Sequence, residues 1–91
     1  MNNSNLILLI NHLSSKEIRI FHDWLRSPIH NLRPDLPKLF NYFTNDVTGF
    51  REDCLDMGMI WHYLYPNKSL NENLLRQIMH MLLKSLEEFI S

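Results

Sequence analysis

The chain of 91 residues carries nine basic and ten acidic side chains, has a net charge of −1, and is 45% hydrophobic. This composition excludes a disordered chain and lacks the strongly basic character of a typical nucleic-acid-binding domain. The longest uninterrupted apolar run, residues 6–10, is too short to cross a membrane. With only two glycines and few β-branched residues other than isoleucine, residues 1–91 are expected to form a single α-helical domain.

Cys54 is the only cysteine, which excludes an internal disulfide and is compatible with a reducing compartment. The first residues show neither the basic segment nor the small-residue cleavage site of a secretion signal. We therefore expect a cytoplasmic protein that does not insert into a membrane.

The first half of the chain begins with two predicted helices. A short apolar helix is expected over residues 5–12, capped by Ser4. The second helix has a well-defined start, because Ser14 and Glu17 match a capping box and Leu13 and Ile18 are spaced for a hydrophobic staple. Its predicted buried face consists of Ile18, Phe21, Trp24 and Leu25.

The second helix should end at Pro28, which forces the residue before it into an extended conformation. Residues 27–34 then form a connector bounded by two prolines. Asp35 is expected to cap a third helix that tolerates Pro37 in its first turn and ends near Asn45. The residues expected to face inward are Leu36, Leu39, Phe40 and Phe43.

A polar loop is predicted over residues 46–53, followed by a fourth helix from about residue 56 to residue 64. Whether this helix begins earlier, near Glu52, stays open because Gly58 weakens the helical pattern. Its expected inner face consists of Met57, Ile60, Trp61 and Leu64.

The last helix is the longest, and it is predicted over residues 69–90 with Ser69 and Glu72 as a capping box. Its apolar residues form two stripes, so it should pack against neighbours on two sides. One stripe consists of Leu74, Ile78, Met81 and Phe89, and the other of Leu75, Met79, Leu82, Leu86 and Ile90. The predicted fold is therefore all-α, a compact bundle of about five helices around a long C-terminal helix.

Residues 13–31 read L-S-x-K-E-x-x-x-F-x-x-W-L-x-S-P-x-x-N. A second block contains Tyr-Leu-Tyr-Pro at residues 63–66, Leu-Asn at 70–71, Leu-Leu at 74–75 and LL-x-x-LEEF at 82–89. Together these blocks resemble the N-terminal segment of a group of long, uncharacterised bacterial proteins. Ile29 and His30 depart from that pattern, which has an aromatic residue there. The resemblance implies an N-terminal helical module, usually followed by more helical chain, and it supplies no catalytic residues.

No constellation of side chains in the sequence points to catalysis, a metal or a cofactor. The histidines are not at the spacing of a metal site, and Cys54 lies among acidic residues that raise a thiol pKa rather than activate it. The five histidines are His12, His22, His30, His62 and His80. We therefore expect a protein that is not an enzyme and needs no cofactor.

Contact with protein is the leading functional hypothesis, through a partner, a second copy of the chain or the rest of a longer polypeptide of which this module is the N-terminal part. It rests on more apolar surface than five short helices should bury, with both tryptophans expected inside and the three tyrosines near the outer faces. The end of the last helix should contribute to association more than to folding. The candidate interface residues are Ile29, Leu32, Tyr63, Tyr65, Phe89 and Ile90.

The alternative hypothesis is a helix-turn-helix-like domain that binds nucleic acid through the second helix and the connector. Its candidate contacts are Lys16, Arg19, Arg26 and Arg33. Asp23 interrupts this basic stripe, and the net charge of the chain is negative, so nucleic acid is the less favoured partner.

Overall fold

The computed structural model describes residues 4–29, 31, 33–44 and 57–90. The helices in this part of the chain are α1 (Ser4–Asn11), α2 (Ser15–Arg26), α3 (Asp35–Thr44), α4 (Met57–Leu64) and α5 (Glu72–Ile90). No strand occurs within those ranges. The prediction of an all-α bundle with a long C-terminal helix is confirmed.

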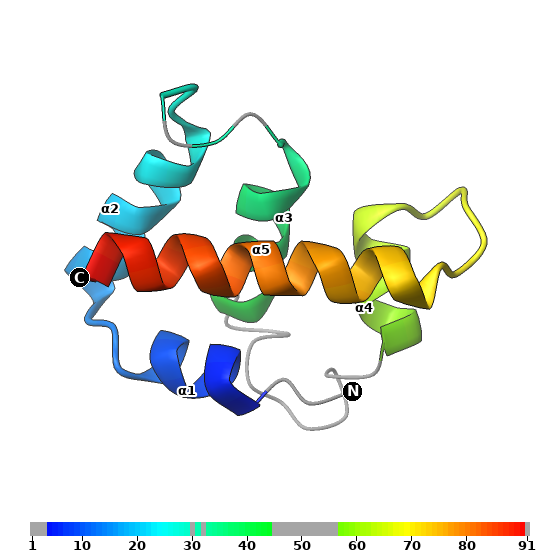
Figure 1. Ribbon diagram of the computed structural model, residues 1–91, viewed down its shortest axis with the longest axis horizontal. Coiled ribbons are helices and arrows are strands. Elements are labelled where there is room, and N and C mark those ends of the chain that lie inside the picture. Colours follow the sequence, from blue (N-terminus) through cyan, green and yellow to red (C-terminus); the bar gives the residue numbers. More distant parts are fainter. Residues whose placement is uncertain (1–3, 30, 32, 45–56, 91) are drawn as a thin grey trace.

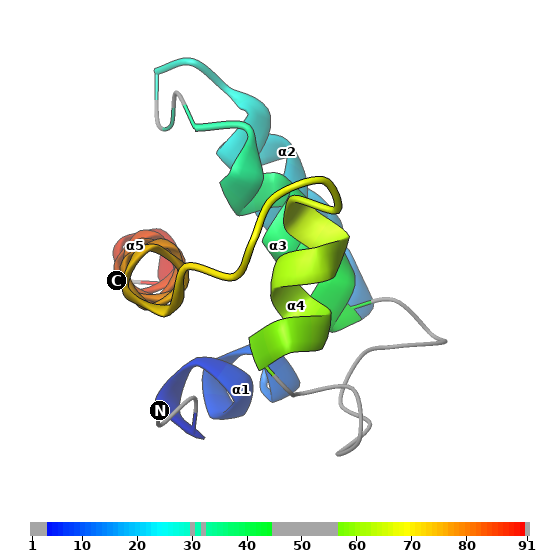
Figure 2. The same cartoon turned by 90° about the vertical axis from the view of Figure 1, so that its right-hand side faces the viewer.

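The helices surround a central pair formed by α3 and α5. Figure 1 shows α5 crossing the whole length of the molecule, with α2 and α4 towards its opposite ends and α1 along its lower side. In the end-on view of Figure 2, α5 lies on one side of the group formed by α2, α3 and α4. Both α3 and α5 pack against each of the other helices. The two-sided burial expected for α5 is therefore present.

A single hydrophobic cluster joins all of these helices. Phe21, Phe40 and Phe43 are its largest fully buried side chains, and Phe21 meets Phe40 edge to face with ring centroids 4.9 Å apart. The buried apolar residues are Leu6, Ile10, Phe21, Leu25, Leu36, Leu39, Phe40, Tyr42, Phe43, Ile60, Trp61, Leu64, Leu75, Ile78, Met79, Leu82 and Leu86. The inner face predicted for α3 is buried throughout. In α5, Leu75, Ile78, Met79, Leu82 and Leu86 are buried, whereas Leu74, Met81 and Phe89 are half-buried and Ile90 is 50% exposed.

The start of α2 matches its prediction in detail. The backbone amide of Glu17 donates to Ser14 Oγ at 3.1 Å, and the amide of Ser14 donates to Glu17 Oε1 at 2.8 Å. These reciprocal bonds satisfy two amides that have no partner within the helix. The helix ends at Arg26 with Ser27 in an extended conformation as its cap, as expected for the residue before Pro28.

The start of α5 differs from its prediction. The helix begins at Glu72, and its first turn is capped by Asn71, whose Oδ1 accepts from the amide of Leu74 at 3.0 Å. The expected capping box of Ser69 and Glu72 is therefore wrong. Asn71 is as good a cap as Ser69, and it stands immediately before the first residue of the helix.

Two other expectations concern α3 and the segment that follows it. Tyr42 was expected near an outer face, but it is buried, with its ring 5.1 Å from that of Tyr63 and 5.6 Å from that of Phe43. The position of α3, enclosed by other helices, leaves it no solvent-facing side at Tyr42. The terminator Asn45, the loop 46–53 and the question of a start near Glu52 lie outside the described residues.

Candidate functional site

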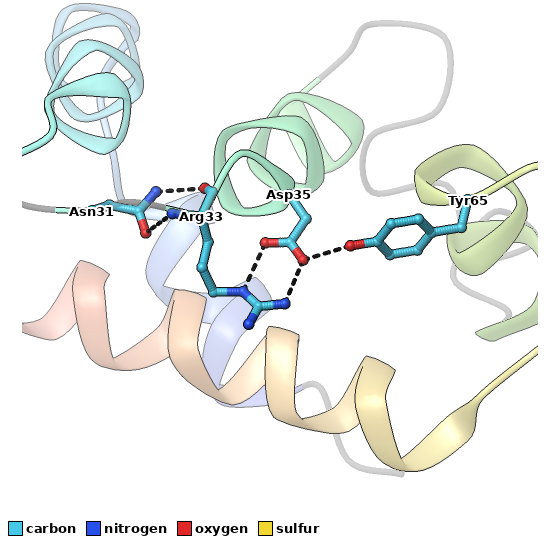
Figure 3. Close-up of polar contacts among 4 residues, drawn as sticks. All are labelled: Asn31, Arg33, Asp35 and Tyr65. Atoms are coloured by element: carbon cyan, nitrogen blue, oxygen red, sulfur yellow. Dashed lines mark hydrogen bonds and ion pairs between the residues drawn. The ribbon is translucent and has the colours of Figure 1, made fainter.

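A carboxylate at the start of α3 is the centre of a group of three polar side chains. Arg33 donates to Asp35 through Nε (3.0 Å to Oδ1) and Nη2 (2.8 Å to Oδ2), and the Tyr65 hydroxyl donates to Oδ2 at 2.7 Å. Figure 3 shows the guanidinium and the phenol approaching the carboxylate from opposite sides. Asp35 is buried, whereas the Arg33 side chain is 42% exposed. The sequence predicted Asp35 only as a helix cap.

These contacts shift the ionisation of all three groups. Burial on its own would raise the pKa of Asp35, but the hydrogen bonds from Arg33 and Tyr65 outweigh it, and the pKa is lowered. The hydrogen bond with Asp35 raises the pKa of Arg33, while burial and the same carboxylate raise the pKa of Tyr65. The group is therefore a stable ion pair at neutral pH, with Asp35 charged and Tyr65 protonated.

Asn31 fixes the connector that leads into this cluster. Its amide nitrogen donates to the carbonyls of Leu25 (2.9 Å) and Arg33 (2.7 Å), and its Oδ1 accepts from the Arg33 amide at 3.1 Å (Figure 3). The end of α2 is thus tied to Arg33, and Arg33 is tied to Asp35 and Tyr65. This chain of bonds links the connector to the turn after α4, and its role is structural.

An apolar patch lies where the end of α5 meets α2. Trp24 and Phe89 are half-buried, with ring centroids 5.9 Å apart, and Phe89 also packs 5.0 Å from Phe21. Ile20 lies one turn before Trp24 and is 45% exposed, and Ile90 follows Phe89 and is 50% exposed. We call Ile20, Trp24, Phe89 and Ile90 the α2–α5 patch.

The other predicted interface residues do not join this patch. Tyr63, in α4, and Tyr65, in the turn after it, are half-buried; Tyr63 accepts from Asn41 at 2.9 Å and Tyr65 donates to Asp35. Helix α4 lies towards the end of α5 away from α2 (Figure 1). Ile29, in the turn after α2, is 89% exposed, and Leu32 lies outside the described residues. Of the candidates that the structure describes, only Phe89 and Ile90 belong to the α2–α5 patch, and the two tyrosines make intramolecular contacts.

The predicted basic residues separate in a similar way. Arg19 and Arg26 are exposed on the flank of α2 that faces α3, whereas Arg33 is engaged by Asp35. Lys16 is exposed at the start of α2 and is not among the residues lining the hollows between α2 and α3. Lys38 of α3 does line that side, although nothing in the sequence places it beside α2.

The histidines that the structure describes are dispersed. His12 Nδ1 lies 2.6 Å from the Leu8 carbonyl, His22 is half-buried, and His62 and His80 are exposed. No group of three or more potential metal ligands occurs in the described ranges, which do not include His30 or Cys54. Within the same ranges, no helix combines the length and hydropathy needed to cross a membrane.

Comparison with known proteins gives no match to a protein-family model, a curated protein or a solved structure. The resemblance to the N-terminal segment of long bacterial proteins therefore stays a prediction. A function for this protein is therefore inferred from the geometry of its described residues.

Proposed function

We propose that this protein is a non-enzymatic helical module that associates with protein, either a partner or a second copy, through the α2–α5 patch. The observation that supports this most directly is the exposure of Ile20, one turn before Trp24, and of Ile90, next to Phe89 in the sequence, at 45% and 50% beside a packed Trp24–Phe89 pair. A half-exposed aromatic pair beside exposed aliphatic side chains has the composition of an interface centre. A cytoplasmic location is part of the same proposal.

The patch is suited to the centre of an interface and not to the whole of it. Burying the exposed half of each isoleucine would stabilise a complex by about 1 kcal/mol. A specific interface buries about 800 Å² on each partner, which is more than these four side chains can supply. Polar residues around the patch must therefore complete the contact. Such a small apolar centre favours a contact that is regulated or of moderate affinity.

The test is a double substitution, Ile20→Ser with Ile90→Ser, examined by sedimentation over a range of concentrations and by quantitative capture of native partners. Both positions are already half exposed, so the variant should remain folded. A matched control is Leu8→Ser with Leu70→Ser, at positions 55% and 45% exposed on α1 and before α5.

The proposal expects the patch variant to lose self-association or partner capture while the control retains it. A wild-type protein that stays monomeric, together with an equal set of captured proteins for the wild type and both variants, would refute it.

A further inference from the structure

A continuous groove runs between α2 and α3, on the opposite flank of α2 from the α2–α5 patch. Three hollows with volumes of about 370, 360 and 320 Å³ follow one another along it, all open to solvent. The first and second share Arg26 and Pro37, and the second and third share His22 and Asn41. The hollows are therefore parts of one groove, which we call the α2–α3 groove.

The groove is basic in a protein whose net charge is −1. Among the described residues, four basic side chains line it, Arg19, Arg26, Arg33 and Lys38, together with one carboxylate, Asp23, at the end near the start of α2. Asp35 is buried and pairs with Arg33, so it offsets the charge of that guanidinium. Arg19, Arg26 and Lys38 outweigh Asp23, so the described lining carries a net positive charge.

Two of these cations are available for an external partner. Arg19 and Arg26 are exposed and form no ion pair within the described residues. Arg33 and Lys38 are held in place, Arg33 by Asp35 and Lys38 by a 3.3 Å bond from Nζ to the Leu64 carbonyl. The groove thus combines two fixed cations with two that can move to meet a ligand.

The end of the groove beside the connector is preformed. Pro28, Pro34 and Pro37 line it together with Leu25, and Asn31 ties both ends of the connector. Prolines have a fixed φ angle, so little conformational entropy remains to be lost when a ligand binds there. Apolar walls beside guanidinium groups suit a chain that alternates aliphatic and acidic side chains.

From this geometry we propose that the α2–α3 groove binds an acidic, extended peptide segment of a partner protein. The twelve residues of α2 give the groove a length of about 18 Å, which five or six residues of extended chain match. Carboxylates of the segment pair with Arg19 and Arg26, and its aliphatic side chains cover the prolines. This site is separate from the α2–α5 patch and does not depend on it.

A nucleic acid is the competing occupant, and the position of Asp23 favours the peptide. Asp23 lies in the groove beside Arg19, where it would repel a phosphate backbone, which is uniformly negative. A peptide can present an uncharged residue to Asp23, and its carboxylates can be spaced to meet only the arginines.

The experiment measures binding of a fluorescent peptide of about eight residues, with alternating Glu and Leu, by anisotropy at two salt concentrations. A peptide with Gln in place of Glu, a single-stranded oligonucleotide and a duplex are the comparison probes. The test variant is Arg19→Glu with Arg26→Glu, both exposed residues whose change should leave the fold intact. The matched control, Arg76→Glu with Lys84→Glu, makes the same change in net charge on α5.

The acidic peptide should bind the wild type and the α5 variant alike, and binding to the groove variant should be weaker by at least about tenfold. The Gln peptide should bind poorly. Equal weakening in both charge variants, or no binding of the acidic peptide to the wild type, would overturn the proposal. Tighter binding of an oligonucleotide that the groove variant abolishes would assign the groove to nucleic acid. The Ile20→Ser, Ile90→Ser variant should retain peptide binding. A negative result for the α2–α3 groove can therefore be distinguished from a negative result for the α2–α5 patch.

Discussion

The contact most open to a quantitative test is the carboxylate of Asp35. Replacement by Asn keeps the shape of the side chain but removes its charge and leaves one acceptor oxygen where three hydrogen bonds now end. A hydrogen bond to a charged group contributes about 1.5–3 kcal/mol. The Arg33 side chain is 42% exposed, so water can replace part of what it loses. We therefore expect Asp35→Asn to lower the free energy of unfolding by about 2–3 kcal/mol, less than for a fully buried pair.

The effect should depend on pH in a defined direction. The pKa of Asp35 is lowered in the folded protein below its ordinary value of 3.8. A lowered pKa means that the folded state binds the proton less readily than the unfolded state does. The stabilisation by the Asp35 carboxylate is therefore complete when the pH is above the ordinary pKa of the unfolded chain. It is lost as the pH falls through the lowered pKa of the folded protein. The difference between wild type and Asp35→Asn should shrink as the pH falls from about 5 towards about 2.

Urea unfolding followed by tryptophan fluorescence provides the assay. Trp61 is a local reporter, because its ring lies 4.9 Å from that of Tyr65 and its Nε1 donates to the Lys68 carbonyl at 3.0 Å. Asp23→Asn, at an exposed carboxylate on α2, is the control and should change stability by less than about 0.5 kcal/mol. A cost below about 0.5 kcal/mol for Asp35→Asn, or a cost that does not change with pH, would refute the reasoning.

Four further substitutions test the packing by the same unfolding assay. Ser14→Ala should cost about 1 kcal/mol through the capping box, and a silent substitution would mean that those hydrogen bonds contribute nothing. Leu82→Ala, at a fully buried position, should cost about 2–5 kcal/mol, and a cost near zero would contradict its place in the core. Phe89→Ala should cost more than about 1 kcal/mol, because Phe89 packs on Phe21. Ile90→Ala should cost less than about 0.5 kcal/mol, because Ile90 is half exposed. Equal costs for the two substitutions would contradict this difference in packing.

The sequence predicted the helices well because their ends depend on local chemistry. Ser14 with Glu17 and the residue before Pro28 act within one turn of the chain, so their patterns identify both ends of α2. The burial of Phe40 and Leu82 likewise follows from helical spacing alone. Where two equivalent local signals compete, as Ser69 and Asn71 do before α5, the sequence does not decide between them.

The contacts that define the candidate surfaces join residues far apart in the chain. Asp35 and Tyr65 are separated by 30 positions, and Asn41 and Tyr63 by 22. Helical periodicity gives the face on which a side chain lies but not the neighbour that it meets. Tyr63 and Tyr65 were therefore assigned to an outer surface although their hydroxyl groups have intramolecular partners. Lys38 was overlooked for the same reason, since only the packing of α3 brings it beside Arg26.

The geometry of α2 explains how a small domain can offer two dissimilar surfaces. Phe21 and Leu25 anchor the helix in the core, which leaves a flank on each side of that buried line. Successive residues of an α-helix turn by 100°, so Ile20 and Trp24 fall on the flank towards α5, and Arg19 and Arg26 fall on the flank towards α3. An apolar contact on one flank and an ionic contact on the other respond to different conditions, because salt screens the second far more than the first. Raising the ionic strength should therefore weaken binding of an acidic segment in the α2–α3 groove while association through the α2–α5 patch persists.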